Sequence, residues 1–117
     1  MIHNEGYFPG NISFIFTDDD FLQEMNRRYL EHDYFTDVIT FDLSVKKNIL
    51  DGEIYISVDT VRENAKTYGG TGQTEILRVM VHGILHLAGY GDSNEDEKVV
   101  MRSRENFYID KFKEDDF

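Results

Sequence analysis

Cysteine is absent from the 117 residues of the chain. This absence excludes disulfide bridges and every metal site that depends on thiolate ligands. Any metal ion must therefore be held by histidine and carboxylate side chains. A chain without cysteine is also typical of a reducing compartment, and we expect a cytoplasmic protein.

Long hydrophobic segments are also missing. No apolar run approaches the roughly 18 residues that a membrane-spanning helix needs. The first eleven residues, MIHNEGYFPGN, lack the basic segment followed by an apolar one that marks a secretory signal. We expect one domain over residues 1–117, large enough to bury a single core, with no membrane and no disulfide partner.

Basic residues are scarce, because 12 lysines and arginines stand against 23 aspartates and glutamates and give a net charge of −11. Such a surface favours solubility and repels nucleic acid at long range, but it permits a local basic patch. Much of the acidity lies in three groups, at residues 18–20, 95–97 and 114–116. We interpret these groups as solvated surfaces or helix starts.

Strand and helix patterns alternate along the chain. Segments rich in β-branched and aromatic residues predict strands at 11–17, 36–43 and 52–58. The segment KKNILDG, residues 46–52, is predicted to be a turn region. Apolar spacing predicts helices at 18–30, 59–68 and 73–88, and a last helix from a Ser93–Asp96 capping pair to about Phe112. Interleaved strands and helices favour an α+β fold, a small mixed sheet with helices packed on it.

The helix predicted at 73–88 carries two of the four histidines, four residues apart. At about 100° per residue, its apolar residues form one stripe, and His82 and His86 fall on the opposite side. Residues at this spacing are neighbours, so both imidazoles can reach one point. Gly89 then permits a sharp turn that returns Asp92 toward the pair. The stripe consists of Ile76, Leu77, Met80, Val81, Ile84, Leu85 and Ala88.

The resulting pattern, H-x-x-x-H-x-x-G-x-x-D, has the ligand spacing of the zinc motif H-E-x-x-H-x-x-G-x-x-H. Three protein ligands leave one coordination position open, as in catalytic zinc sites. We predict that His82, His86 and Asp92 bind one ion, Zn²⁺ or another divalent transition metal, on a central helix of the fold. The alternatives are surface histidines and an Asp92 that caps the next helix. Zinc proteases place their general base after the first histidine, where this chain has Gly83, and we assign that glycine to close approach of another backbone or of substrate.

The segment HGILHLAGYGD resembles the pattern H-G-x-L-H-L-x-G-Y-D-H of the YbeY family, metal-dependent endoribonucleases that act in ribosomal RNA maturation. Two other segments resemble that family in the same order. MNRRYLEHDYFTDVITF is similar to its L-N-x-x-Y-R-x-x-D-x-x-T-D-V-L-S-F segment, and DGEIYIS to its L-G-D-I-x-I strand. The resemblance runs from about Ile12 to beyond Met101. It implies a single-strand-specific endoribonuclease with ribosomal RNA as substrate and ribosomal small-subunit proteins as possible partners.

The chain departs from the family pattern in several places. The third family histidine is Asp92, a residue type that also ligates zinc. The family arginine after the tyrosine is Leu30, and the nearby Arg28 is our candidate for contacting RNA phosphate, with Arg27, Arg62 and Arg78 as further candidates. Tyr34 and Tyr90 are candidates for stacking on bases. Family members also begin with a further strand and helix, for which this chain has almost no room, so we expect both to be absent.

Three other functions remain open from the residues. One is a metallopeptidase of an atypical zincin type, which Gly83 disfavours because it cannot take a proton. Another is a non-haem iron oxygenase, which shares the ligand set of two histidines and a carboxylate. The last is a non-catalytic module that binds the ribosome and holds a structural metal. No general base can be named, although Glu75 lies on the histidine side of the predicted helix.

Overall fold

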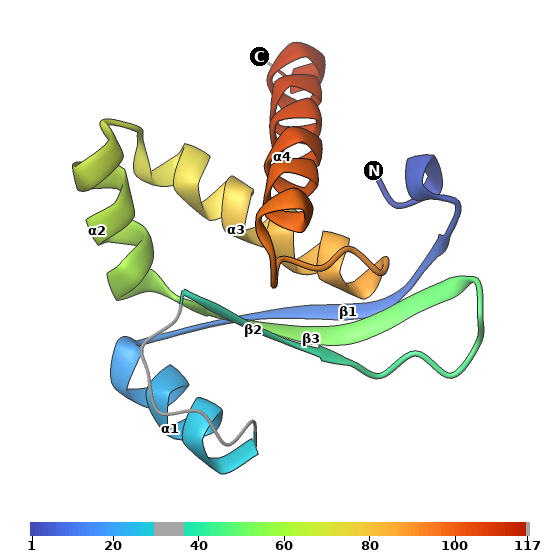
Figure 1. Ribbon diagram of the computed structural model, residues 1–117, viewed down its shortest axis with the longest axis horizontal. Coiled ribbons are helices and arrows are strands. Elements are labelled where there is room, and N and C mark those ends of the chain that lie inside the picture. Colours follow the sequence, from blue (N-terminus) through green and yellow to red (C-terminus); the bar gives the residue numbers. More distant parts are fainter. Residues whose placement is uncertain (30–36, 117) are drawn as a thin grey trace.

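The computed structural model describes residues 1–29 and 37–116, and in this part of the chain a single sheet lies between helical layers (Figure 1). Its strands are β1 (Phe8–Thr17), β2 (Val38–Asp42) and β3 (Ile49–Ser57), in the order β1-β3-β2. β1 runs parallel to β3, and β2 runs antiparallel to it. The mixed sheet confirms the predicted α+β fold. Ahead of β1 lies a single 3₁₀ turn, η1 (His3–Glu5).

Each α-helix of the described residues begins beside a polar side chain that accepts a hydrogen bond from a backbone N–H of its first turn. The helices are α1 (Asp19–Tyr29), α2 (Val58–Tyr68), α3 (Gly72–Leu87) and α4 (Glu95–Asp116). Their caps are Asp18, Ser57, Thr71 and Asn94. Each cap satisfies an amide that the helix leaves without an internal partner. The acidic residues at the starts of α1 and α4 also suit the positive end of the helix dipole, as predicted.

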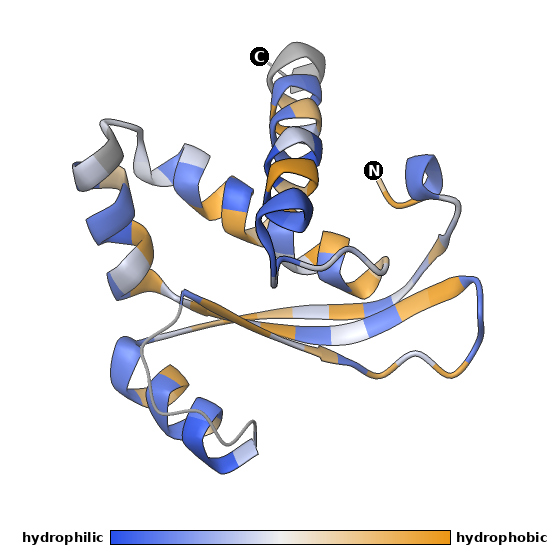
Figure 2. Ribbon diagram, in the orientation of Figure 1, coloured by the Kyte–Doolittle hydropathy of each residue, from blue (hydrophilic) through white to orange (hydrophobic). Residues whose placement is uncertain are grey.

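The two faces of the sheet are covered by different helices. α1 packs Leu22 and Met25 against Ile39 of β2, whereas α2 and α3 cover the opposite face (Figure 1). Alternation along β3 explains this division, because Ile54 and Ile56 face α3 and the intervening Tyr55 faces α1. Figure 2 shows apolar residues concentrated in the strands and polar residues on much of the helical surface.

The apolar residues of α3 lie on two sides of the helix. Ile76, Met80 and Ile84 pack against the cluster on the sheet, as the stripe predicted. Val81 and Leu85 instead pack against Met101 and Tyr108 of α4. α3 is therefore central, because it lies between the sheet and α4. The stripe omitted two residues that are also buried in the cluster on the sheet, Val79 and Leu87.

Three local predictions were wrong. Residues 49–51 belong to β3, not to a turn, because Ile49 and Leu50 pair with the start of β1. The last helix is capped by Asn94 rather than by a Ser93–Asp96 pair, since the Asn94 side chain accepts from the Glu97 amide at 2.8 Å. Gly83 faces the sheet, where an added Cβ would lie 2.7 Å from Ile54 Cγ2. Its close approach is therefore to a side chain of the core and not to a backbone or a substrate.

Some predictions fall on residues that the structure does not describe. The start of the strand predicted at 36–43, the end of the helix predicted at 18–30, and the residues Leu30 and Tyr34 lie outside residues 1–29 and 37–116. Within the described ranges, none of the helices combines the length and apolar composition needed to cross a membrane.

Candidate metal centre

The end of α3 and the turn after it bring His82, His86 and Asp92 together. Gly89 adopts a left-handed conformation with φ of 103°, which a glycine tolerates. The Tyr90 amide donates back to the Leu85 carbonyl at 3.0 Å, so the chain reverses close to the helix end. This reversal carries Asp92 back to the two imidazoles, as the sequence spacing predicted. Their possible ligand atoms all lie within 4.8 Å of one another.

The three possible ligand atoms lie close enough together to surround one metal ion. Nε2 of His82 and Nε2 of His86 are 2.9 Å apart. Asp92 Oδ2 lies 3.3 Å from the first of these nitrogens and 3.4 Å from the second. A tetrahedron with metal–ligand bonds of about 2.0–2.1 Å has edges of about 3.3–3.4 Å. The two distances from Asp92 match these edges, whereas the two imidazole nitrogens lie closer together. The donor set of two imidazoles and one carboxylate fits zinc in its chemistry.

The remaining ring nitrogens of both histidines are held by other groups. Nδ1 of His86 lies 3.0 Å from the Tyr90 carbonyl oxygen, and Nδ1 of His82 lies 2.7 Å from Glu105 Oε2. A carbonyl oxygen can only accept, so Nδ1 of His86 carries the hydrogen and Nε2 keeps its lone pair. The carboxylate of Glu105 favours the same tautomer in His82. Both rings thus present Nε2 to the point where a metal would lie.

Glu105 is a buried charge with paired oxygens. The residue is 5% exposed, and its Oε1 lies 3.0 Å from Arg78 Nη1. Burial raises the pKa of its carboxyl, but the hydrogen bonds from His82 and Arg78 outweigh burial and lower it. For His82, burial lowers the pKa, and the hydrogen bond and charge of Glu105, with the charges of Asp37 and Asp92, raise it above its ordinary value.

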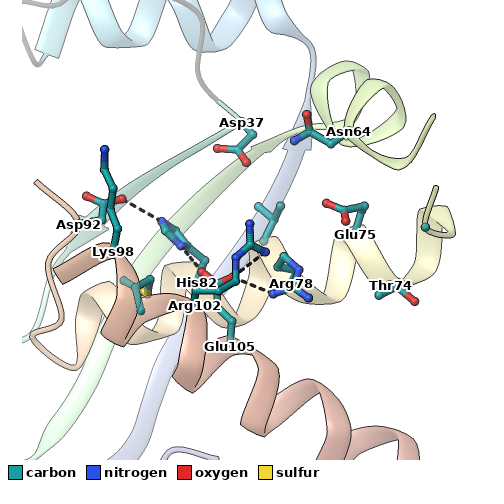
Figure 3. A pocket seen from close by; sticks show the side chains of 13 residues that line it. Asp37, Asn64, Thr74, Glu75, Arg78, His82, Asp92, Lys98, Arg102 and Glu105 are labelled. Carbon is teal, nitrogen blue, oxygen red and sulfur yellow. Dashed lines mark hydrogen bonds and ion pairs between the residues drawn. The ribbon is translucent and has the colours of Figure 1, made fainter. Parts of the chain in front are cut away.

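A polar cavity of about 680 Å³ adjoins the cluster (Figure 3). His82 and Asp92 form part of its wall, and Arg78, Lys98 and Arg102 supply positive charge to it. Asp37, just before β2, points into the cavity from the side opposite α4 (Figure 3). Burial raises the pKa of the Asp37 carboxyl, and the nearby charge of His82 only partly offsets it.

The other predicted residues lie in different places. Arg78 and Glu75 line the cavity, whereas Arg28 lies on α1, across the sheet, with its Nε 3.1 Å from Glu24. Arg27 pairs with the same glutamate. Tyr90 donates its hydroxyl hydrogen to Glu5 at 2.6 Å, so its ring is held by the protein. The structure therefore brings Arg78, but not Arg28, to the cluster.

The sequence patterns did not single out Asp37 or Glu105. A signal for Glu105 was present, because it interrupts the apolar positions of the last helix, four residues after Met101 and three before Tyr108. A carboxylate at such a position needs a buried partner. Asp37 lies in the T-D-V segment that the family resemblance includes, but the periodicity of the strand gives no reason to single it out.

Comparison with known proteins identifies the family. A family model described as endoribonuclease YbeY matches residues 2–113. The chain belongs to the YbeY family. A relative from Cytophaga hutchinsonii, named endoribonuclease YbeY, is 45% identical over 102 residues, which cover 87% of this chain and 71% of the relative. One of the same name from Christiangramia forsetii is 44% identical over 111 residues, covering 95% and 77%.

A solved structure supports the same relationship. The solution structure of a Thermotoga maritima protein is 32% identical and covers 92% of this chain and 71% of its own, with a TM-score of 0.63. The predicted resemblance to the YbeY family is confirmed over nearly the whole chain. The departure at the third family histidine is thus a substitution within a family member, and Asp92 Oδ2 lies 3.3 Å from Nε2 of His82 and 3.4 Å from Nε2 of His86.

Proposed function

We propose that this chain is a zinc-dependent endoribonuclease that cleaves single-stranded regions of ribosomal RNA during ribosome maturation. The observation that carries the proposal is the convergence of His82, His86 and Asp92, of which His82 and Asp92 lie on the wall of a polar cavity. Membership of a family whose relatives are named endoribonucleases supports the reaction class. A cytoplasmic location and contacts with small-subunit proteins form part of the same proposal, because ribosomes of bacteria mature there.

The cavity provides a place for a phosphodiester beside the metal ligands. A bound divalent ion supplies Lewis acidity and positive charge that offset the charge developing on phosphoryl oxygens. Arg78 and Arg102 add cationic groups on the same wall. The long-range field of an acidic protein is confined to about 8 Å by physiological salt, so local cations can dominate at the site. In this proposal, the two arginines hold the phosphate and the three ligands hold the ion.

Asp37 is the proposed acid–base group. Its carboxyl points into the cavity, and burial raises its pKa toward the range in which a general base works well. In the proposed role, a carboxylate oxygen of Asp37 accepts the proton from the attacking oxygen, whether that oxygen belongs to water or to the RNA 2′-hydroxyl. Gly83 has no side chain that could take a proton, and its α-carbon faces Ile54 rather than the cavity. A peptidase of the H-E-x-x-H type is therefore not favoured.

The decisive experiment is cleavage of an end-labelled single-stranded RNA from the small-subunit ribosomal RNA, with the matching duplex for comparison. The purified protein loaded with Zn²⁺ should cut the single strand and spare the duplex. His86→Ala should lose both the bound zinc and the cleavage. His3→Ala is the matched control, because His3 is exposed and outside the cluster, and it should keep both.

Two results would contradict the proposal in different ways. Cleavage by His86→Ala at the wild-type rate would separate the activity from the metal cluster. Zinc binding without cleavage of any RNA would instead favour the non-catalytic, ribosome-binding module. Proteolysis of a casein substrate that depends on His86 would support the atypical metallopeptidase.

A further inference from the structure

Glu105 is a carboxylate placed in an otherwise apolar contact between two helices. Its side chain is 7% exposed and lies on the stripe of α4 that carries Met101 and Tyr108, against Val81 and Leu85 of α3. A carboxylate in such surroundings has a large desolvation cost unless both oxygens have partners. The packing alone would favour an apolar residue here, so the charge needs a separate explanation.

The two oxygens of Glu105 bind different side chains of α3. Oε2 lies 2.7 Å from Nδ1 of His82, and Oε1 lies 3.0 Å from Nη1 of Arg78. Arg78 and His82 are four residues apart and therefore neighbours on one face of the helix. Arg102 approaches the same Oε1 from α4 at 3.8 Å. Glu105 thus bridges two successive turns of α3, and Figure 3 shows this bridge below the cavity.

We propose that Glu105 is a positioning residue for the metal centre, and that Arg78 orients it. The hydrogen bond from Nδ1 of His82 fixes the tautomer and the rotation of the ring, so that Nε2 points toward Asp92 and His86. A carboxylate partner also makes the imidazole a stronger donor to a metal than a neutral partner would. His86 has only a backbone carbonyl at its Nδ1, so the two histidine ligands are not equivalent.

The network also sets the charge of the site. The cavity lining carries three cations, Arg78, Lys98 and Arg102, against four carboxylates, Asp37, Glu75, Asp92 and Glu105, so a bound divalent ion changes its formal charge from −1 to +1. An anionic ligand therefore meets a positive cavity when the ion is bound, although the whole chain carries −11. The inference rests on the metal centre of the proposed function, but not on RNA as the substrate.

The experiment compares two buried carboxylates. Glu5 has the same 7% side-chain exposure as Glu105, binds Arg104, Tyr108 and the hydroxyl of Tyr90, and contacts neither histidine directly. Glu105→Gln and Glu5→Gln therefore remove the same charge from similarly buried sites. Both variants are compared with wild type for Zn²⁺ affinity by chelator competition, for the visible absorption spectrum with Co²⁺, and for urea unfolding without metal.

We expect Glu105→Gln to lower the Zn²⁺ affinity by roughly 10- to 100-fold and to shift the Co²⁺ spectrum. Glu5→Gln should reduce the stability of the metal-free protein but change the affinity less than twofold. Arg78→Lys keeps a positive charge beside Oε1 of Glu105 and should lower the Zn²⁺ affinity by only a few-fold. If Glu105→Gln does not fold, this lysine variant provides the test, because its loss of affinity must exceed that of Glu5→Gln.

Three results would overturn the inference. Wild-type affinity and spectrum in folded Glu105→Gln would exclude a positioning role. An equal loss of affinity in Glu5→Gln would show that loosening of α4, and not the bond to His82, weakens the site. Absence of Zn²⁺ binding by the wild type would overturn the metal centre itself, whereas a failure to cleave RNA would leave this inference standing.

Discussion

Gly83 of α3 lies directly against the side chain of Ile54 in the central strand. Ile54 is fully buried, and three of its side-chain carbons would lie within 3.3 Å of a Cβ added to Gly83. The glycine lets the helix lie close to the sheet at the position next to His82. The distance between His82 and the sheet therefore depends on Gly83 having no side chain.

Gly83→Ala is expected to destabilise the protein although alanine is the better helix former. The gain in helix propensity is about 1 kcal/mol, whereas overpacking of a tight core contact costs about 1–3 kcal/mol. In Ile54→Ala the same substitution should stabilise the chain, because the new methyl group enters the cavity that the isoleucine leaves. Urea unfolding of both single variants and the double variant measures this reversal of sign. Additive effects would show that the two residues do not compete for space.

Asp92→His is expected to keep one metal ion per chain, because it restores the family ligand at the same position. Asp92→Ala should leave only two ligands and bind more weakly. Metal content after dialysis, measured by mass spectrometry, checks both variants. Free Zn²⁺ at about 100 times its dissociation constant should also stabilise the wild type by about 2.7 kcal/mol. Equal zinc content in Asp92→Ala and wild type would remove Asp92 from the ligand set.

The metal-free protein is expected to be most stable in mildly acidic solution. The pKa of His82 is raised on folding, so its protonated form stabilises the folded state. This contribution has its full value below pH 6.5, the pKa in the unfolded chain, and is lost as the pH rises through the folded pKa.

The pKa of Glu105 is lowered on folding, so its carboxylate form stabilises the folded state. This contribution has its full value above pH 4.5, the pKa in the unfolded chain, and is lost as the pH falls through the folded pKa. Both are present together between these two values.

Urea unfolding in the presence of a chelator, from about pH 4 to about pH 8, measures this profile. Glu105→Gln should flatten it, because neither partner then gains from the pair. Asp37 also has a raised pKa and adds stability on the acidic side, so Asp37→Asn should remove only that share. A wild-type profile that rises steadily toward pH 8 would contradict the pairing of His82 with Glu105.

Arg102 is expected to contact RNA phosphate, whereas Arg28 is the contact predicted from the sequence. The two side chains are similarly exposed, at 64% and 68%, but only Arg102 lines the cavity beside the histidines. Loss of one phosphate contact to single-stranded RNA makes the plot of log affinity against log salt concentration less steep by roughly 0.7. RNA affinity at several salt concentrations should show this change in Arg102→Ala and not in Arg28→Ala. The reverse pattern would place the RNA on the side of α1.

The sequence predicted which three side chains converge at the end of α3, because the geometry that brings them together is local. An i, i+4 pair on a helix and a glycine turn fix three side chains through short stretches of backbone. The parts it could not predict depend on contacts between distant segments. Glu105 reaches His82 only when α4 packs on α3, and the direction of Gly83 is decided by Ile54 on β3.

The strand boundaries illustrate the same limit. Residues 46–52 contain two lysines, an asparagine and a glycine, which favour a turn. Pairing with β1 nevertheless extends β3 back to Ile49, because a neighbouring strand satisfies backbone groups that a local pattern cannot account for. The position of Arg28 was likewise drawn from the resemblance, and its helix lies on the other face of the sheet.

The parallel pairing of β1 with β3 has a consequence for the order in which the chain folds. Partners in this ladder, such as Thr17 and Ser57, are about 40 residues apart, whereas β2 and β3 are joined by a short connection. Closing the longer loop has the larger entropic cost, so we expect the β2–β3 hairpin to form early and β1 to dock late. The histidines lie on a helix packed over this sheet. Rapid kinetics should therefore find the hairpin in the transition state and metal binding only after β1 has joined.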